Sequence, residues 1–276
     1  MNFKGMKKAA AVCLAGMMAL SLAACGSSSK SGLDAIKDRG YVNVGVKADV
    51  PKFSLQNTAT GKYEGFEDDL AYAIAGKILG ISAEDAKAQD KVKFQAVNAK
   101  TRGPLIENGE VDYVIATFTI TDERKETYNF SPAYYEDAVG VLVNKDSGIK
   151  TLDDLDGKKI GVSQGSTTKE VFLQYIKDQG SNAVPEFQEF ATYPELAQAL
   201  AAKQIDAFSV DGAILAGYLN DSNELLDIHF APQEYGVASN KDNKDLSDLI
   251  NSTVQEMLDN GEMNKLLEAN GLTPKE

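Results

Sequence analysis

The stretches ENGEVDYVIA (107–116) and AAKQIDAFSV (201–210) carry one pattern at two places in the chain. Each has the end of a helix, a turn, an apolar residue, an aspartate and then an apolar run as long as a buried strand. Outward from both stretches, strand-like and helix-like segments alternate. This alternation predicts a largely parallel sheet covered by helices. Because the pattern occurs twice, the sequence predicts an α/β protein with two similar lobes.

The clearest helix is 66–80, which has apolar residues at four-residue intervals, acids in its first turn and Gly80 at its end. Short apolar runs that end at turn residues predict the strands. The predicted strands are 41–46, 92–97, 111–116, 158–163, 186–190 and 205–210, and the predicted helices are 66–80, 104–108, 168–180 and 194–203.

Two further segments are predicted to connect the lobes. The run 139–144 leads into the second lobe, and the run 234–239 leads back to helices that complete the first. Lobe 1 is thus predicted to comprise 33–138 plus 236–276, and lobe 2 to comprise 139–235. Two crossings form a hinge, and we expect a ligand cleft between the strand ends of the two lobes.

Residues 1–24 have the features of a signal peptide, a basic start followed by a short apolar run. This segment is followed by Cys25, in a sequence LAAC (22–25) that resembles a bacterial lipoprotein signal. We expect lipid on Cys25, a flexible tether over 25–32 and a location on the extracytoplasmic face of the cell membrane, in the periplasm or at the cell surface. The alternative is an ordinary secretory signal that is cleaved nearby.

The whole-chain composition limits the partners. The formal net charge is −13, which makes nucleic acid an unsuitable ligand, and a small anion would need a local positive pocket. A single histidine excludes a histidine-based metal site. We expect no cofactor.

Arginine is rare in this chain: three arginines, Arg39, Arg102 and Arg124, stand against a majority of lysines. Arg124 lies in TFTITDERKE (117–126), just past a predicted strand and behind Thr117 and Thr119. A guanidinium grips a carboxylate or phosphate through two parallel hydrogen bonds, which lysine cannot do. The stretch therefore predicts an anion site.

Other candidate site residues also follow or open predicted elements. Thr167 fits the first position of a capping box at a helix start, where free backbone N–H groups favour an anion. Asp211 precedes a helix, and its simplest role is that of an N-cap. Arg102 stands near a helix start, where the helix dipole disfavours a cation; it either shares a bound anion with the helix or is a solvated loop residue. Lys47 follows the first strand.

Four segments carry a family resemblance: GFEDDLAYAIA, ATFTITDERKETYNFSPAYY, SQGSTTKE and DAFSVD. Through them the chain resembles, nearly end to end, the family 3 solute-binding proteins of bacterial ABC importers for polar amino acids. This resemblance implies the two-lobed (type II) periplasmic-binding-protein fold, which closes on one amino acid and has no enzyme activity. It also implies that Arg124 holds the α-carboxylate together with Thr119 and a backbone N–H at Thr167, and that Thr117 lies beside the α-ammonium group, whose counter-ion is Asp211.

The segments VGVKADVP (44–51) and AVNAKTRGPL (96–105) are similar to members that bind aspartate and glutamate. In those members, cations that match Lys47 and Arg102 hold the side-chain carboxylate, and a tyrosine that matches Tyr193 assists. Many members also stack the ligand on an aromatic residue near the first strand, for which Phe53 is the candidate here.

The expected function is therefore capture of aspartate or glutamate and delivery to the permease of an ABC importer, by a lipid-anchored monomer. Two alternatives stay within binding: a ligand such as glutamine or cystine, or a sensor that reports to a membrane receptor. A third is enzymatic. GVSQG (161–165) matches the nucleophile elbow G-x-S-x-G and His229 follows it, but the predicted helix begins too late after Ser163. A dehydratase built on the same fold is the other enzymatic alternative.

Overall fold

The computed structural model describes residues 32–274. The predicted signal peptide, Cys25 and nearly all of the tether lie outside this range. Within it, no helix combines the length and the apolar character that crossing a membrane requires. The first described element is α1 (Gly32–Arg39), which precedes the first strand.

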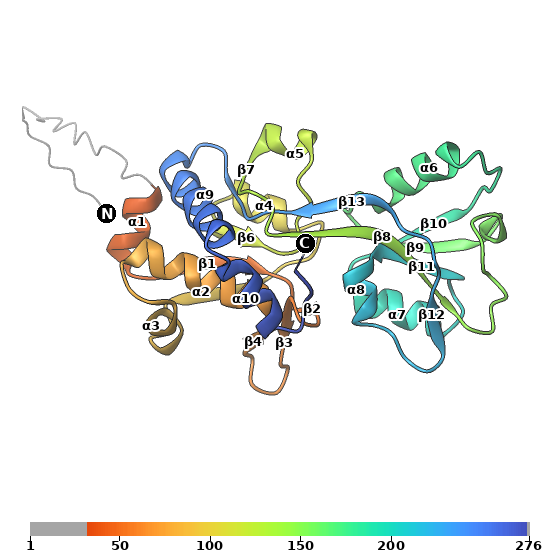
Figure 1. Ribbon diagram of the computed structural model, residues 1–276, viewed down its shortest axis with the longest axis horizontal. Helices are drawn as coiled ribbons and strands as arrows, with labels where there is room; N and C mark the ends of the chain where they lie inside the picture. Colours follow the sequence, from red (N-terminus) through yellow and green to blue (C-terminus); the bar gives the residue numbers. More distant parts are fainter. Residues whose placement is uncertain (1–31, 275–276) are drawn as a thin grey trace, which may run out of the picture. The chain divides into compact units, whose positions relative to one another are not determined.

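The first sheet has the strand order β5-β1-β6-β14-β7 (Figure 1). Three strands at one side of this sheet are parallel, with β1 between β5 and β6. The fourth strand, β14, is antiparallel to β6 and to β7. The strands are β1 (Val42–Val46), β5 (Val92–Ala96), β6 (Tyr113–Ile115), β7 (Tyr128–Phe130) and β14 (Ala238–Asn240).

The second sheet has the order β10-β9-β11-β8-β12, and β13 also pairs with β8. Again three strands are parallel, and the next strand, β8, runs antiparallel to them. Figure 1 shows β8 and β13 as adjacent long strands, and their pairing is antiparallel. The strands are β8 (Tyr135–Asn144), β9 (Lys159–Ser163), β10 (Glu186–Phe190), β11 (Ala207–Asp211), β12 (Asn223–Leu225) and β13 (Phe230–Tyr235).

The two sheets share one strand arrangement, and the repeated aspartate has the same role in each. Asp112 accepts a hydrogen bond from the N–H of Asn43 at 2.6 Å, and Asp206 accepts one from the N–H of Lys159 at 2.8 Å. In both cases the aspartate before the third strand holds the beginning of the first strand. The internal repeat in the sequence therefore has a physical basis, and the predicted two-lobed α/β fold is confirmed.

The prediction of largely parallel sheets holds for three adjacent strands at one side of each sheet, β5-β1-β6 and β10-β9-β11, and is wrong beyond them. Both connections between the lobes, β8 and the β13–β14 segment, pair in antiparallel fashion. A small antiparallel sheet was also not predicted, because its strands are only two or three residues long. It comprises β2 (Asp49–Val50), β3 (Ser54–Gln56) and β4 (Tyr63–Glu64).

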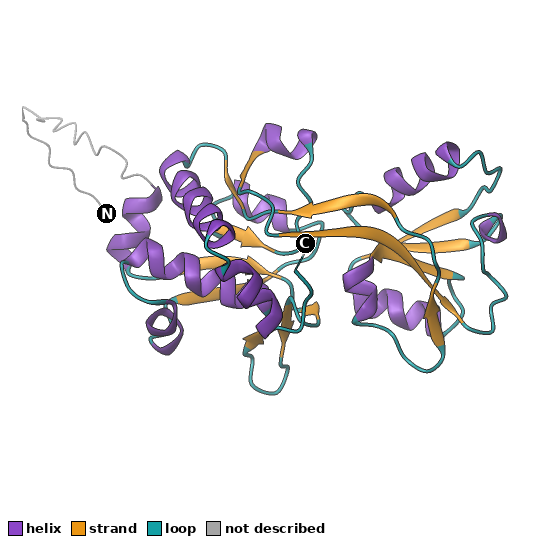
Figure 2. Ribbon diagram, in the orientation of Figure 1, coloured by secondary structure: helices purple, strands orange, loops and turns teal. Residues whose placement is uncertain are grey.

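Helix α2 (Phe66–Leu79) has the predicted stripe, because Phe66, Leu70, Ile74 and Ile78 are all buried. Gly80 ends it in a left-handed conformation, as predicted. Helices α2 and α9 pack on the first sheet (Figure 2). The other helices are α3 (Ala83–Ala88), α4 (Arg102–Glu107), α5 (Asp122–Thr127), the 3₁₀ turn η1 (Asp153–Leu155), α6 (Thr168–Asp178), α7 (Tyr193–Ala201), α8 (Gly212–Ala216), α9 (Lys244–Asp259) and α10 (Glu262–Ala269).

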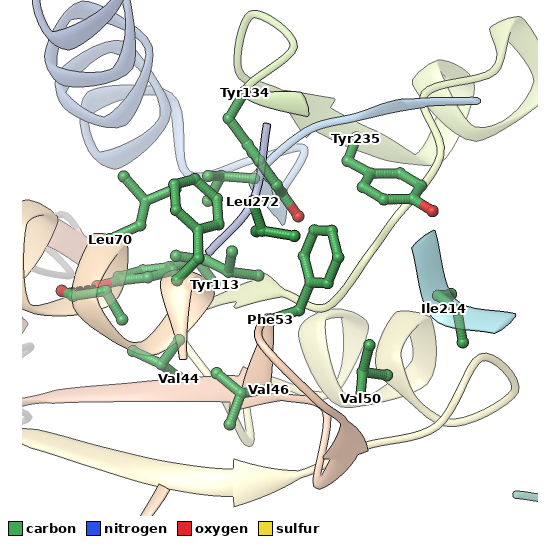
Figure 3. Packing of buried hydrophobic residues seen from close by; sticks show 14 of the residues in the cluster. Val44, Val46, Val50, Phe53, Leu70, Tyr113, Tyr134, Ile214, Tyr235 and Leu272 are labelled. Atoms are coloured by element: carbon green, nitrogen blue, oxygen red, sulfur yellow. Dashed lines mark hydrogen bonds between the residues drawn. The ribbon is translucent and has the colours of Figure 1, made fainter. Parts of the chain in front are cut away.

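Phe53 belongs to an aromatic cluster in the core. Its ring packs edge-to-face against Phe66, Tyr135 and Tyr235, and it is fully buried. Figure 3 shows the ring of Phe53 beside that of Tyr235. Edge-to-face contacts of this kind stabilise a core beyond the area they bury. We therefore assign Phe53 to core packing rather than to stacking against a ligand.

Candidate ligand-binding site

The eight candidate residues lie at or beyond strand ends, or in the first turns of helices. Lys47 follows β1, and Thr117 and Thr119 follow β6. Asp211 ends β11, and Thr167 directly precedes α6. The fold brings together candidate positions that are far apart in the chain, since the ammonium group of Lys47 lies against the ring of Tyr193. The remaining candidates are Arg102 at the start of α4, Arg124 in α5 and Tyr193 at the start of α7.

Arg102 is not a solvated loop residue, since only 3% of it is exposed. Its Nη1 atom donates to the carbonyl oxygens of Ala116 at 2.7 Å and Thr117 at 2.9 Å. Its guanidinium carbon lies 4.0 Å from the ring centre of Phe118. The Nε atom is buried and has no hydrogen-bond partner in the described part of the chain. A buried donor of this kind is costly unless a ligand completes it.

Arg124 lies against the same aromatic ring, 4.8 Å from the centre of Phe118. Nη1 donates to the carbonyl of Thr119 at 2.8 Å, and Nη2 donates to the carbonyl of Gly165 at 3.2 Å. Gly165 lies in the loop between β9 and α6, so this bond joins the first lobe to the second. Burial, followed by the positive charge of Arg102, lowers the pKa of Arg124 to about 10. Two cations are therefore held close together without a fully compensating anion.

Thr117 has a backbone conformation that is unusual for a β-branched residue, with φ at 44°. Two charged side chains hold it from either side: its N–H donates to Glu67 at 2.6 Å, and its carbonyl accepts from Arg102. The hydroxyl Oγ1 is buried and has no hydrogen-bond partner within residues 32–274. Strain that the surroundings maintain, together with an unpartnered hydroxyl, is typical of a functional position.

Lys47 is fully buried, and its ammonium group lies 3.2 Å from Asp49 Oδ1 and 4.3 Å from the ring centre of Tyr193. The other carboxylate oxygen of Asp49 accepts from the backbone N–H of Tyr193 at 3.2 Å. Burial lowers the pKa of Lys47, and the charge of Asp49 opposes that shift. From the sequence we expected Lys47 to be a cation without a protein partner, whereas in the structure it is paired with Asp49.

Asp211 stands at the N-cap position of α8 but makes no side-chain capping bond, so its interpretation as a helix cap is wrong. Its carboxylate accepts instead from the hydroxyl of Tyr235 on β13. Burial, and then the negative charge of Asp137, raise the pKa of Asp211 to about 7, while Arg102 and Arg124 oppose the shift. A cationic partner would stabilise the ionised form of this buried carboxyl group.

The predicted capping box at Thr167 does not form either, since this residue makes no side-chain capping bond. Gln233 on β13 explains why. Its Oε1 accepts from the hydroxyls of Thr119 at 2.8 Å and Thr167 at 3.3 Å, and its Nε2 donates to the carbonyl of Ala231. The Ala231 bond fixes the amide orientation, so both threonine hydroxyls must direct their protons at Gln233.

Sequence reasoning missed Asp49, Glu67, Gln233 and Tyr235. Glu67 and its neighbour Asp68 were interpreted only as acids in the first turn of a helix, and both are buried. Tyr235 lies in the return run 234–239 and Gln233 directly precedes that run, which was interpreted only as a connection. The one signal available in the sequence is that Glu67 lies three residues before Leu70, and a residue at this spacing lies on the same helix face as the apolar stripe.

The hydrolase interpretation finds no support in the geometry. Ser163 is buried at the end of β9, and α6 begins only at Thr168. The side chain of His229 is largely exposed and lies 4.0 Å from Asp227. A nucleophile elbow needs a helix directly after an exposed serine, with a histidine within reach of it.

Residues 42–271 match the family described as bacterial extracellular solute-binding proteins, family 3. The chain belongs to this family. It is a solute-binding protein rather than an enzyme.

Relatives extend over almost the whole chain. The ABC transporter glutamine-binding protein GlnH of Bacillus subtilis is 36% identical over 95% of this chain and 96% of that protein. The L-cystine-binding protein TcyJ of Escherichia coli is 34% identical over 92% of this chain and 93% of its own. The glutamate-binding protein GluB of Corynebacterium glutamicum is 32% identical over 94% and 88%, respectively.

Among solved structures, an ancestral arginine-binding protein bound to arginine is similar to this chain. The TM-score is 0.70 at 34% sequence identity, over 84% of this chain and 98% of that one. The type II periplasmic-binding-protein fold that the resemblance implied is thereby confirmed.

Proposed function

We propose that this solute-binding protein captures aspartate or glutamate between its lobes and delivers it to the permease of an ABC importer. Amino-acid binding is supported by the relatives, which are named for glutamine, cystine and glutamate. Since these names differ, the choice among ligands depends on the site itself. The observation that carries the proposal is the buried Nε of Arg102, a cationic donor that lacks a partner in the described residues.

The charged side chains around Arg102 are complementary to an acidic amino acid, which has two carboxylates and one ammonium group. Arg124 is the partner for the α-carboxylate, and Thr119 and the backbone N–H at Thr167 complete that contact. Asp211 is the counter-ion of the α-ammonium group, beside Thr117. Arg102 remains for the carboxylate of the ligand side chain, with Lys47 and Tyr193 as its neighbours.

The pairing of Lys47 with Asp49 changes how much Lys47 and Arg102 each contribute to ligand specificity. Lys47 is already partly compensated at 3.2 Å, so Arg102 carries most of the discrimination between an acid and an amide. An amide brings no charge to a desolvated guanidinium and offers N–H donors to groups that can only donate. That mismatch is worth several kcal/mol, or at least about 100-fold in affinity. Aspartate and glutamate differ by one methylene, so we do not choose between them.

Calorimetry against the twenty amino acids tests the proposal. We expect aspartate or glutamate to bind most tightly, and Arg102→Ala to weaken both acids at least tenfold more than glutamine. Arg39→Ala is the matched control, because Arg39 is paired with Asp112 away from the site. If glutamine or cystine binds the wild type more tightly than either acid, the acidic specificity is refuted.

Two structural proposals accompany this function. The lobe boundaries are those predicted from the sequence, 33–138 plus 236–276 and 139–235. The protein is a monomer that is anchored to the extracytoplasmic face of the membrane through lipid on Cys25. Stable anchoring needs more than one acyl chain. Cys25→Ala should release the protein from the membrane, and a variant that stays bound as before would contradict the anchor.

A further inference from the structure

Glu67 is a buried carboxyl group that contacts the candidate site through the backbone of Thr117. It lies in the first turn of α2, where acids are usually solvated, yet it is fully buried. Its Oε1 accepts from the N–H of Thr117 and from the hydroxyl of Tyr134, both at 2.6 Å. Its Oε2 is buried without a hydrogen-bond partner in the described part of the chain.

Glu67 and Arg102 hold the same residue. Glu67 accepts from the N–H of Thr117, and Arg102 donates to the carbonyl of Thr117. These two hydrogen bonds hold the backbone of Thr117 at its positive φ. A carboxylate and a guanidinium therefore share one strained residue whose hydroxyl is unpartnered.

Charged groups face Glu67 from several elements. Lys47 after β1 and Arg102 of α4 favour its ionised form, and Asp68, the next residue of α2, feels its negative charge. Tyr134, just before β8, is a neutral donor. When it is ionised, Glu67 therefore offsets part of the positive charge of these two buried cations, in addition to Asp49, which lies beside Lys47.

An acidic ligand introduces a second anion for the same two cations. We propose that Glu67 is a specificity-determining residue: its charge sets how strongly the site prefers an acidic to a neutral side chain, and it takes up a proton from the solvent when an acidic ligand binds. The proton converts the carboxylate to a carboxylic acid, and the ligand carboxylate then replaces it as the anion of the site. This inference rests on the proposed function, because it assigns the side-chain pocket to Lys47 and Arg102.

The proton affinity of Glu67 is compatible with this exchange. Burial raises the pKa of Glu67 to about 7, against the hydrogen bonds from Tyr134 and Thr117 and the charges of Lys47 and Arg102. A ligand carboxylate beside the same cations would raise that pKa further. Uptake of one proton makes acidic ligands bind more tightly as pH falls through neutrality, while an amide of the same size lacks this dependence.

The experiment compares L-glutamate with L-glutamine by calorimetry at pH 6, 7 and 8. Both ligands share the α-carboxylate and α-ammonium groups, so the ratio of their dissociation constants isolates the side-chain response. In the wild type, the preference for glutamate should increase about tenfold from pH 8 to pH 6. Glu67→Gln should increase the preference about tenfold at pH 8 and make it independent of pH.

Asp68→Asn is the matched control. Asp68 is adjacent in the same helix, equally buried, and hydrogen-bonded to Ser54 rather than to Thr117. This variant should keep the pH dependence of the wild type. Tyr134→Phe removes one donor that favours the Glu67 carboxylate, so it should shift the pH dependence to higher pH; it decides the question if Glu67→Gln does not fold.

Three results would overturn the inference: Glu67→Gln keeps the pH dependence of the wild type, Asp68→Asn loses it, or a folded Tyr134→Phe leaves it unshifted. A wild type that prefers glutamine at every pH refutes the acidic specificity alone, because Glu67→Gln should still move the ratio toward glutamate at pH 8. A wild type that binds neither amino acid refutes both proposals.

Discussion

Gly165 offers a direct test of whether ligand binding requires the two lobes to meet at the site. It lies between β9 and α6 with φ at 76°, and its carbonyl accepts from Arg124. A Cβ atom placed on Gly165 would be 2.9 Å from Lys100 Cα and 3.0 Å from the carbonyl oxygen of Ala99. These are backbone atoms of the first lobe, which cannot move aside as a flexible side-chain end could.

The magnitude follows from separating two costs of Gly165→Ala. The positive φ costs roughly 1 kcal/mol, and it does so whether or not the lobes are in contact, so it cancels in binding. The clash with Ala99 and Lys100 exists only when the loops meet. Overpacking of this kind costs about 1–3 kcal/mol. Affinity for the amino acid should therefore fall by about 5- to 150-fold.

Gly148→Ala is the matched control for this substitution. Gly148 also has φ at 76°, but its Cβ would have nothing within 4 Å. Denaturant unfolding without ligand should show a similar loss of stability in both variants, whereas calorimetry should show weaker binding only for Gly165→Ala. Equal affinities for the wild type and Gly165→Ala would refute the reasoning, as would an equal loss of affinity in both variants.

Three further outcomes are expected. Arg124→Ala should weaken the binding of acidic and amide amino acids alike by about 30-fold or more. Arg124→Lys should not restore binding, because an ammonium group cannot form the two parallel hydrogen bonds of a guanidinium. If calorimetry shows native affinity for the Ala variant, Arg124 is not part of the site. Gln233→Leu leaves two threonine hydroxyls without their acceptor, so we expect affinity to fall about 5- to 10-fold, and an unchanged dissociation constant would contradict its bridging role. The pKa is raised to about 7 for Glu67 and Asp211 and to about 8 for Asp68, mainly by burial. The folded ligand-free chain then holds more protons than the unfolded chain between about pH 4 and pH 8. Its free energy of unfolding should increase as pH falls from 8 to 5, by at most about 1.4 kcal/mol per pH unit for each carboxyl group. Denaturant titrations that give the same free energy of unfolding at every pH would argue against these pKa shifts.

The repeated pattern at 107–116 and 201–210 predicted the two α/β lobes, because apolar periodicity and turn residues are local properties of the chain. The predicted helix 66–80 corresponds to α2 within one residue, since its stripe and terminal glycine are both written in the sequence. The antiparallel pairing of β8, β13 and β14 was not predictable in this way. Strand direction depends on which segments pair in the folded protein, and the residues of an apolar run do not specify their pairing partner.

For the site, the sequence by itself determined which residue types were available: a scarce arginine after a strand, threonines beside it, and an aspartate at another strand end. Only the tertiary structure decided what each side chain contacts. It paired Lys47 with Asp49, bonded Asp211 to Tyr235 and buried Glu67 against the backbone of Thr117. The physical reason is that burial and long-range contacts, rather than neighbours in the chain, set the charge and hydrogen bonding of these groups.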